Sequence, residues 1–237
     1  MNKSEKPKRN YQKETEKIIE ELSKNTVEGG LLTNDSLLKP TLLLHACCGP
    51  CSSYVLEFLY KHFDITVFYY NPNIYPEEEY RRRFAELKEL YKKFPPALEG
   101  KVNVVEEEYE PEDFYKAIGI HENPEFAQSP EKGERCRRCY EFRLKKAFEY
   151  AKVHSFNYFC TTLSISPFKD AEKLNVIGEQ LEREALGQGP RWLPSDFKKK
   201  GGFKRSLEIS EEYGMYRQDY CGCIYSKNNR KSAIIES

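Results

Sequence analysis

The sequence lacks any long apolar run. None approaches the roughly 20 residues that a helix needs to cross a bilayer, and the first twenty residues are polar and charged, without the apolar core of a secretion signal. We therefore expect a cytoplasmic protein with no membrane partner, in a compartment where thiols stay reduced.

Nucleotide-binding fingerprints are missing as well. The chain contains neither G-x-G-x-x-G nor G-x-x-x-x-G-K-[ST], which argues against a Rossmann dinucleotide site and a P-loop. It also has no excess of charge, because Lys and Arg total 38 and Asp and Glu total 38. Any nucleic-acid binding must therefore come from a local basic patch.

What the sequence does have is cysteine. Seven of its eight cysteines fall in three close groups, Cys47-Cys48-x-x-Cys51, Cys136-x-x-Cys139 and Cys221-x-Cys223. Thiolates two or three residues apart can converge on one metal. In a reducing compartment such groups indicate metal ligation or redox chemistry rather than structural disulfides. The eighth, Cys160, lies inside an apolar run and is expected to be a core residue.

Cysteine spacing alone does not separate zinc from an iron–sulfur cluster. Pairs of C-x-x-C suit a tetrahedral zinc site, but seven thiolates exceed the ligands of one such ion and point to a second centre. Cys221 and Cys223 would project to one side of an extended backbone. They are expected either to bind metal or to form a reversible local disulfide.

Hydrophobic periodicity predicts strands that alternate with helices. We expect strands at 41–46, 65–70, 102–109 and 157–163, and helices at 52–62, 77–94, 136–153 and 169–186, with Ser52 and Ser53 capping the first helix. This alternation predicts an α/β fold with a mostly parallel, Rossmann-like sheet flanked by helices, and a helical or irregular C-terminal part that bears cysteines.

The first 38 residues differ from the rest in composition. Ile18, Ile19 and Leu22 suit one short amphipathic helix, and residues 27–39 hold Gly-Gly and Thr-Asn pairs typical of a linker. We expect residues 1–38 to be an N-terminal arm and linker, and residues 39–237 to form a single catalytic α/β domain.

Polar residues after the predicted strands are candidates for substrate contact, because ligands bind beyond the carboxyl ends of parallel strands. The candidates are Asn73, Tyr80, Thr162, Ser164, Lys169, Asp196 and Lys198. The stretch 191–205 mixes basic and aromatic residues, which suits phosphates and an unstacked base. The three arginines at 81–83 are expected on a helix surface, and His45 is expected to pack within its strand.

Five segments occur in this order along the chain: HACCGPCSS, YYNPNIYPEEEYRRR, GERCRRCYEFRL, TTLSISPFKD and YRQDYCGC. The set resembles the QueH-type, cobalamin-independent epoxyqueuosine reductases, from about residue 41 to residue 226. The resemblance implies an oxidoreductase of tRNA processing. Its reaction would be the last step of queuosine biosynthesis, the two-electron removal of the epoxide oxygen from epoxyqueuosine at the wobble position.

The same resemblance implies the cofactors, partners and site residues. It implies a [4Fe-4S] cluster bound by Cys47, Cys48, Cys136 and Cys139, and a possible second, mononuclear iron for which Cys51 is a ligand. Cys221 and Cys223 are implied as a redox-active disulfide or as further metal ligands. Catalytic roles are therefore expected for Cys51, Cys221 and Cys223, with tRNA bearing epoxyqueuosine and an unidentified low-potential electron donor as partners.

Two other functions have specific requirements. An adenylating tRNA thiolase needs a Ser- and Gly-rich pyrophosphate loop after the first strand, where this chain has CCGPCSS. A structural zinc RNA-binding adaptor would contain zinc alone, whereas a reductase of this type would contain iron and acid-labile sulfide.

Overall fold

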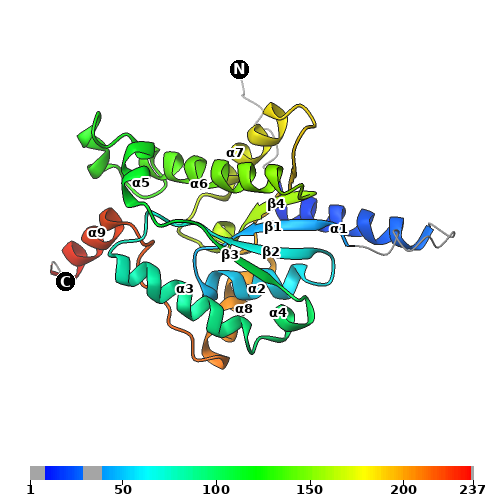
Figure 1. The fold of residues 1–237 in the computed structure, drawn as a ribbon. Helices are drawn as coiled ribbons and strands as arrows, with labels where there is room; N and C mark the ends of the chain where they lie inside the picture. Colours follow the sequence, from blue (N-terminus) through cyan, green and yellow to red (C-terminus); the bar gives the residue numbers. More distant parts are fainter. Residues whose placement is uncertain (1–8, 29–38, 236–237) are drawn as a thin grey trace, which may run out of the picture.

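The fold is built around five parallel strands. The computed structural model describes residues 9–28 and 39–235 (Figure 1). The strands are β1 (Thr41–His45), β2 (Asp64–Tyr69), β3 (Asn103–Glu106), β4 (Tyr158–Thr161) and β5 (Arg191–Trp192). Their order in the sheet is β3-β2-β1-β4-β5, and every pair is parallel. The predicted α/β class is confirmed.

Helices connect the strands and extend the chain at both ends. They are α1 (Tyr11–Glu28), α2 (Gly49–Leu59), α3 (Glu77–Tyr91), α4 (Pro95–Glu99), α5 (Pro111–Ile118), α6 (Glu134–Val153), α7 (Ala171–Glu184), α8 (Gly202–Glu212) and α9 (Ile224–Ile235). Short 3-10 turns occur at η1 (Pro124–Gln128), η2 (Thr162–Ile165) and η3 (Lys199–Gly201). Among the described residues, no helix combines the length and apolar character that a membrane span requires.

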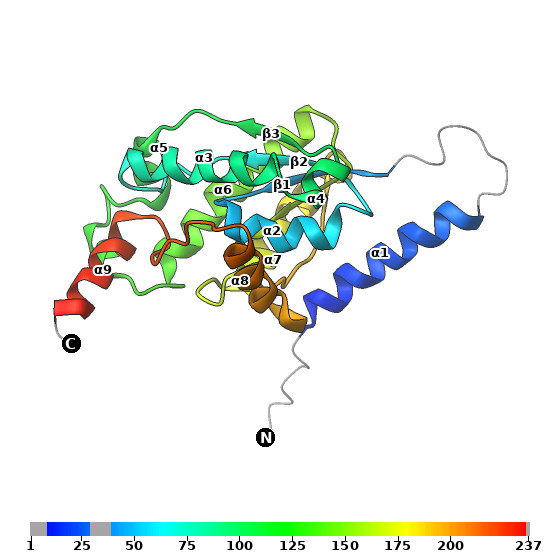
Figure 2. The same cartoon turned by 90° about the horizontal axis from the view of Figure 1, so that it is seen from below.

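The two faces of the sheet are covered by different helices. Leu42 and Leu44 of β1 pack in a core with α2 and α3, whereas Leu43 packs in a second core with α6 and α7. Successive side chains of a strand point to opposite faces, which explains the alternation. Figure 1 shows α6 above the sheet and α2 and α3 below it, and Figure 2 shows the molecule from the latter side.

The strand order creates a switch point between β1 and β4. From β1 the chain continues to β2 on one side, and from β4 it continues to β5 on the other. Loops diverge at such a point, and ligands bind in the crevice that opens there. The first cysteine segment follows β1 directly, and residues 162–169 follow β4.

Helix α2 begins earlier than predicted. It starts at Gly49, with Cys48 as the extended residue before it and a proline in its first turn, where a missing N–H is tolerated. Ser52 and Ser53 therefore do not cap it, and each donates its hydroxyl to a carbonyl three residues back. As a result Cys51 lies in the first helical turn.

Helix α1 packs against the domain. Ile18, Ile19 and Leu22 border the core of α2 and α3, which confirms the predicted amphipathic helix. The Thr15 hydroxyl donates to a main-chain carbonyl just after β5. The predicted linker falls mostly on residues 29–38, outside the described residues.

The prediction that aromatic residues of the stretch 191–205 contact an unstacked base is wrong for Trp192 and Phe197. Trp192 is buried in β5, and its Nε1 donates to Asn175 Oδ1 at 3.0 Å. Phe197 is fully buried. Helix α7 approaches the indole so closely at Gly178 that a Cβ there would lie 2.1 Å from the ring. These rings fill the core, because their apolar area stabilises the fold more when it is buried than when it is exposed.

Candidate active site

Three thiols of the first cysteine segment meet in space. The Sγ atoms of Cys47, Cys48 and Cys51 all lie within 4.8 Å of one another, and those of Cys47 and Cys48 are 3.8 Å apart. The end of β1 positions the first two, and the first turn of α2 positions the third. Three convergent thiols form a donor set for a soft or borderline metal or an iron–sulfur cluster.

One thiolate dominates this three-thiol group. Burial opposes ionisation of Cys48, but hydrogen bonds with Cys47 and Cys51 outweigh it and lower the Cys48 pKa well below the usual value. The Arg83 charge acts in the same direction, and Gln218 Nε2 donates to Cys48 Sγ at 3.0 Å. Hydrogen bonds with Cys47 and Cys48 raise the pKa of Cys51.

A second thiolate lies at Cys221. Its hydrogen bond with Cys223 and the nearby charges of Lys169 and Arg143 lower its pKa, against the effect of burial. Lys169 Nζ donates to Cys221 Sγ at 2.7 Å. Burial opposes the charge of this ammonium, but the Cys221 thiolate outweighs that effect and raises the pKa of Lys169. Gly222 lies between the two cysteines with φ +124°, a conformation that favours glycine.

The pair on α6 lies near the C-terminal thiols, because, besides burial, the charge of Cys221 raises the pKa of both Cys136 and Cys139. Cys136 borders the core cluster that contains Cys47 and Cys48, and Cys139 packs in a small cluster with Cys223. Burial raises the pKa of Cys139 to about 11 and also raises that of Cys136. Neither belongs to the three-thiol group.

A buried guanidinium links these segments. Arg143 is 1% exposed, and its Nη1 donates to Asn71 Oδ1 at 3.1 Å. Its Nη2 has no hydrogen-bond partner among the described residues. Burial opposes its charge, but electrostatic interaction with the sulfurs of Cys139, Cys221 and Cys47 raises its pKa. One cation thus interacts with thiols from all three cysteine segments.

Arg83 is buried, so the prediction that all three arginines of 81–83 lie on a helix surface is wrong for this one. It is 1% exposed, its Nε lies 2.6 Å from Glu79 Oε1, and its Nη1 donates to the Cys221 carbonyl at 3.2 Å. Arg81 and Arg82 are exposed. Helix α3 thus turns one arginine inward to hold the C-terminal cysteine loop.

A cavity of about 110 Å³ opens between the thiol groups. Its polar wall includes Cys47, Cys51, Arg143, Lys169, Gln218 and Cys221, and its apolar wall includes Leu163, Ile165, Phe168, Phe203 and Tyr220. Phe168 is 54% exposed, so an aromatic ring stands at the rim. The cavity therefore combines thiols, three cations (Arg143, Lys169 and Arg217) and aromatic surface.

Several buried polar atoms near the thiols lack partners among the described residues. They include Tyr140 OH, Arg143 Nη2, Gln218 Oε1 and both side-chain polar atoms of Asn73. Buried polar groups are normally hydrogen-bonded, and each one left without a partner destabilises the fold by about 1–3 kcal/mol. Arg143 and Gln218 line the thiol-rich cavity, so their unpartnered atoms fit a site that holds a further group. Thiolate donors suit an iron–sulfur cluster and equally suit zinc.

The predicted substrate residues fall into three places. Lys169 lines the cavity, and Asp196 and Lys198 form an ion pair in an adjacent hollow. Asn73 is buried beside Gly222, where an added Cβ would lie 3.5 Å from its amide nitrogen. Their contact with substrate stays a prediction.

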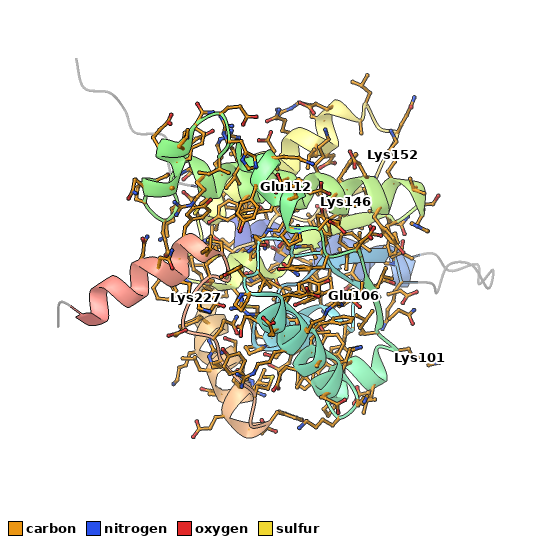
Figure 3. The ribbon with its side chains drawn as sticks, turned by 60° about the vertical axis from the view of Figure 1, so that its left-hand side comes forward. Lys101, Glu106, Glu112, Lys146, Lys152 and Lys227 are labelled. Atoms are coloured by element: carbon orange, nitrogen blue, oxygen red, sulfur yellow. The ribbon has the colours of Figure 1, made fainter. Side chains whose placement is uncertain are left out.

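The remaining three candidates, Tyr80, Thr162 and Ser164, line neither the cavity nor the adjacent hollow. Tyr80 lies on α3, and its hydroxyl donates to Glu106 Oε1 at 3.2 Å. Figure 3 labels Glu106 near this helix. Thr162 is buried in η2, and Ser164 shares a 2.9 Å hydrogen bond with Ser195. Their roles also stay predictions.

Sequence reasoning named Lys169 but missed Arg83, Arg143 and Gln218 as residues of the site. For Arg143 a signal existed, because Cys136, Cys139 and Arg143 are spaced at i, i+3 and i+7 and so share one face of a helix. Gln218 lies in the segment YRQDYCGC, three residues before Cys221, but nothing in that segment predicts its hydrogen bond with Cys48. The expectation that His45 packs within its strand is confirmed, since its two ring nitrogens bond the Thr161 hydroxyl and a main-chain carbonyl.

Comparison with known proteins adds to this geometry. A family model described as epoxyqueuosine reductase QueH matches residues 42–229, which include all eight cysteines. Proteins named epoxyqueuosine reductase QueH are similar along most of the chain. The one from Streptococcus pyogenes serotype M1 is 37% identical over 200 residues, 84% of this chain and 75% of its own. The one from Staphylococcus aureus is 34% identical over 226 residues, 95% of this chain and 87% of its own. The one from Thermotoga maritima is 31% identical over 199 residues, 83% of this chain and 95% of its own.

Proposed function

The chain belongs to the QueH family of epoxyqueuosine reductases, and we propose that its thiol-lined cavity is where it converts epoxyqueuosine to queuosine in tRNA. One observation carries the assignment to this cavity. Thiols from the first and last cysteine segments line it, and Arg143, from the helix that holds the middle segment, completes its wall. The reacting base would be the one at the wobble position.

The reaction places clear demands on such a cavity. Both C–O bonds of the epoxide break, a C=C bond forms, two electrons and two protons enter, and the oxygen leaves as water. Electrons must arrive at low potential, and negative charge that develops on the departing oxygen must be stabilised. A wall of thiols and buried cations suits both demands.

We propose that Cys47, Cys48, Cys136 and Cys139 bind a [4Fe-4S] cluster, and that Cys51 is a ligand of a second, mononuclear iron. Bound there, these centres would supply low-potential electrons and a Lewis acid for the epoxide oxygen. The three convergent thiols and the unpartnered buried polar atoms support this assignment. Cys221 and Cys223 would act as further ligands or as a reversible disulfide.

The chain's own side chains would orient the substrate. Lys169 and Arg143 keep positive charge in a site that excludes most water, where charge–charge interactions are strong. They would stabilise the oxygen as it gains charge. Phe168 and Tyr220 offer aromatic surface against which a base extruded from the anticodon can stack.

The remaining features of the enzyme follow from this assignment. We propose that residues 39–237 form the catalytic domain and residues 1–38 an accessory arm. The enzyme would act in the cytoplasm and take electrons from a low-potential donor.

The test is anaerobic reconstitution with iron and sulfide, followed by mass spectrometry of tRNA that bears epoxyqueuosine. The wild-type protein should remove one oxygen atom per modified base, whereas Cys48→Ala and Cys139→Ala should not. Cys160→Ala is the matched control, because Cys160 is buried away from the cavity lining. Full activity in either ligand variant, or a protein that binds zinc alone, would contradict the proposal.

A further inference from the structure

Beside the cavity lies a larger hollow of about 560 Å³, here called the lysine groove. Four segments line it: residues 9–11 at the start of α1, Lys132 before α6, residues 167–172 before and at the start of α7, and residues 196–199 after β5. The last two segments follow β4 and β5, so the groove lies at the carboxyl edge of the sheet, where ligands of parallel sheets bind.

The groove and the cavity share a wall. Lys169 lines both hollows, Phe168 lines the cavity, and Pro167 lines the groove. A nucleic-acid strand with one base inserted in the cavity would therefore have its flanking nucleotides beside or within the groove.

Most charges of the groove are already compensated. The lining contains Arg9, Lys132, Lys169, Lys198 and Lys199, against Asp170, Glu172 and Asp196. Arg9 pairs with Glu14 and Glu179, and Lys198 pairs with Asp196.

The charges of two lysines in the groove are not compensated. Lys132 and Lys199 are exposed, and neither has a carboxylate partner among the described residues. Lys132 Nζ donates to the Pro167 carbonyl at 3.1 Å, which holds the ammonium at the groove wall and leaves donors for an anion.

We propose that the lysine groove binds the phosphodiester backbone of tRNA next to the base in the cavity, with Lys132 and Lys199 contacting phosphates. The inference rests on the proposed function, because an extruded base needs its flanking nucleotides held beside the cavity. Phosphate contacts supply most of the affinity for nucleic acid and fix its position.

Uncompensated lysines would also attract an acidic electron-carrier protein. The groove favours RNA because it is concave and adjoins the cavity that must receive the base, with Lys169 in the lining of both.

The test uses the full chain and the variants Lys132→Gln, Lys199→Gln and their combination. Binding of tRNA that bears epoxyqueuosine is followed by fluorescence anisotropy across a salt series. The double variant should bind about tenfold more weakly at low salt, and the slope of log K against log[salt] should fall by about 1 for each phosphate that the variant no longer binds. At saturating tRNA, kcat should be unchanged while KM rises.

Lys152→Gln is the matched control. Lys152 is exposed in the last turn of α6 and has no carboxylate partner among the described residues. Since α6 begins at the carboxyl edge of the sheet and leads into β4, its last turn is at the opposite edge. Figure 3 shows Lys152 at the end of α6 remote from Lys227 and α9. This variant should bind tRNA as the wild type does.

Two results would overturn the inference. One is tRNA binding by the double variant with the affinity and salt slope of the wild type. The other is unchanged tRNA binding together with slower turnover on an acidic ferredoxin but not on dithionite, which would assign the lysines to the electron carrier. Binding is measured without turnover, so a wild-type protein that fails to remove the epoxide oxygen would refute the proposed function separately.

Discussion

The contact between Lys169 and Cys221 gives the sharpest prediction about the site. Replacing the lysine by methionine keeps most of its length and apolar volume but removes its charge and its donor. The ammonium lies 2.7 Å from the sulfur and is 8% exposed, so solvent screens the pair little. We expect the pKa of Cys221 to rise in Lys169→Met.

The size of the change follows from the contact. A hydrogen bond to a charged group contributes about 1.5–3 kcal/mol, and each unit of pKa corresponds to about 1.4 kcal/mol. The pKa of Cys221 should therefore rise by about 1–2 units. The hydrogen bond from Cys223 and the charge of Arg143 remain, so part of the lowering should persist.

The same pair makes stability depend on pH. The folded pKa of Cys221 is lowered, so the thiolate's contribution is fully present above the unfolded thiol's pKa of about 8.5 and is lost as pH falls through the lowered value. The folded pKa of Lys169 is raised, so its contribution is fully present below about pH 10.4 and is lost only as pH rises through that raised value. The stability difference between wild type and Lys169→Met should thus be largest between about pH 8.5 and 10.4, and should shrink in acid.

The assay is alkylation of the reduced, metal-free protein with iodoacetamide across a pH series, with Cys221 read out by peptide mass spectrometry. Lys173→Met is the matched control, because Lys173 is a nearby lysine that pairs with Asp170 instead of a thiol. An identical pH profile for Cys221 in Lys169→Met and wild type would refute the reasoning.

Three further predictions concern packing, ligation and the buried ion pair. Gly178→Ala should lower the free energy of unfolding by about 1–3 kcal/mol in urea titrations, because the new methyl group would overlap the indole of β5; an unchanged midpoint would contradict this packing. Cys48→Ala should lose iron and sulfide by chemical analysis after reconstitution, whereas Cys160→Ala should retain both; equal metal content in the two would count against the ligand assignment. Arg83→Met should cost about 3–5 kcal/mol because it leaves Glu79 charged and buried, and adding Glu79→Gln should recover part of that loss; no recovery in the double variant would show that the cost has another origin.

Local sequence patterns were sufficient for the class of fold. Short apolar runs such as TLLLH and the 3.6-residue spacing of apolar side chains in α3 follow from which face of an element is buried, and that information is local. Element boundaries were less accurate where tertiary geometry intervened. The start of α2 depends on how the chain turns at the end of β1, and serine caps predicted from the sequence lie inside the helix instead.

Aromatic and basic residues show a different limit. In the sequence, a tryptophan next to an arginine is typical of a base-binding surface. In the structure, the pairing of β5 with β4 instead packs Trp192 against α7. Likewise Arg81, Arg82 and Arg83 are indistinguishable by composition. Only the docking of the C-terminal loop against one face of α3 makes Arg83 a buried ion-pair residue.

The sequence by itself determined the chemistry available to this protein. Clustered thiols, their short spacing and the order of the motifs depend on residue type, which no later folding step changes. The tertiary structure alone decided which of these residues come together in one site. Cys51, Arg143 and Cys221 come from segments far apart in the chain, and they line one cavity because β1 lies beside β4 in the sheet and the C-terminal loop returns to that edge. Strand order and loop docking depend on the packing of the whole domain, so no local stretch of sequence contains them.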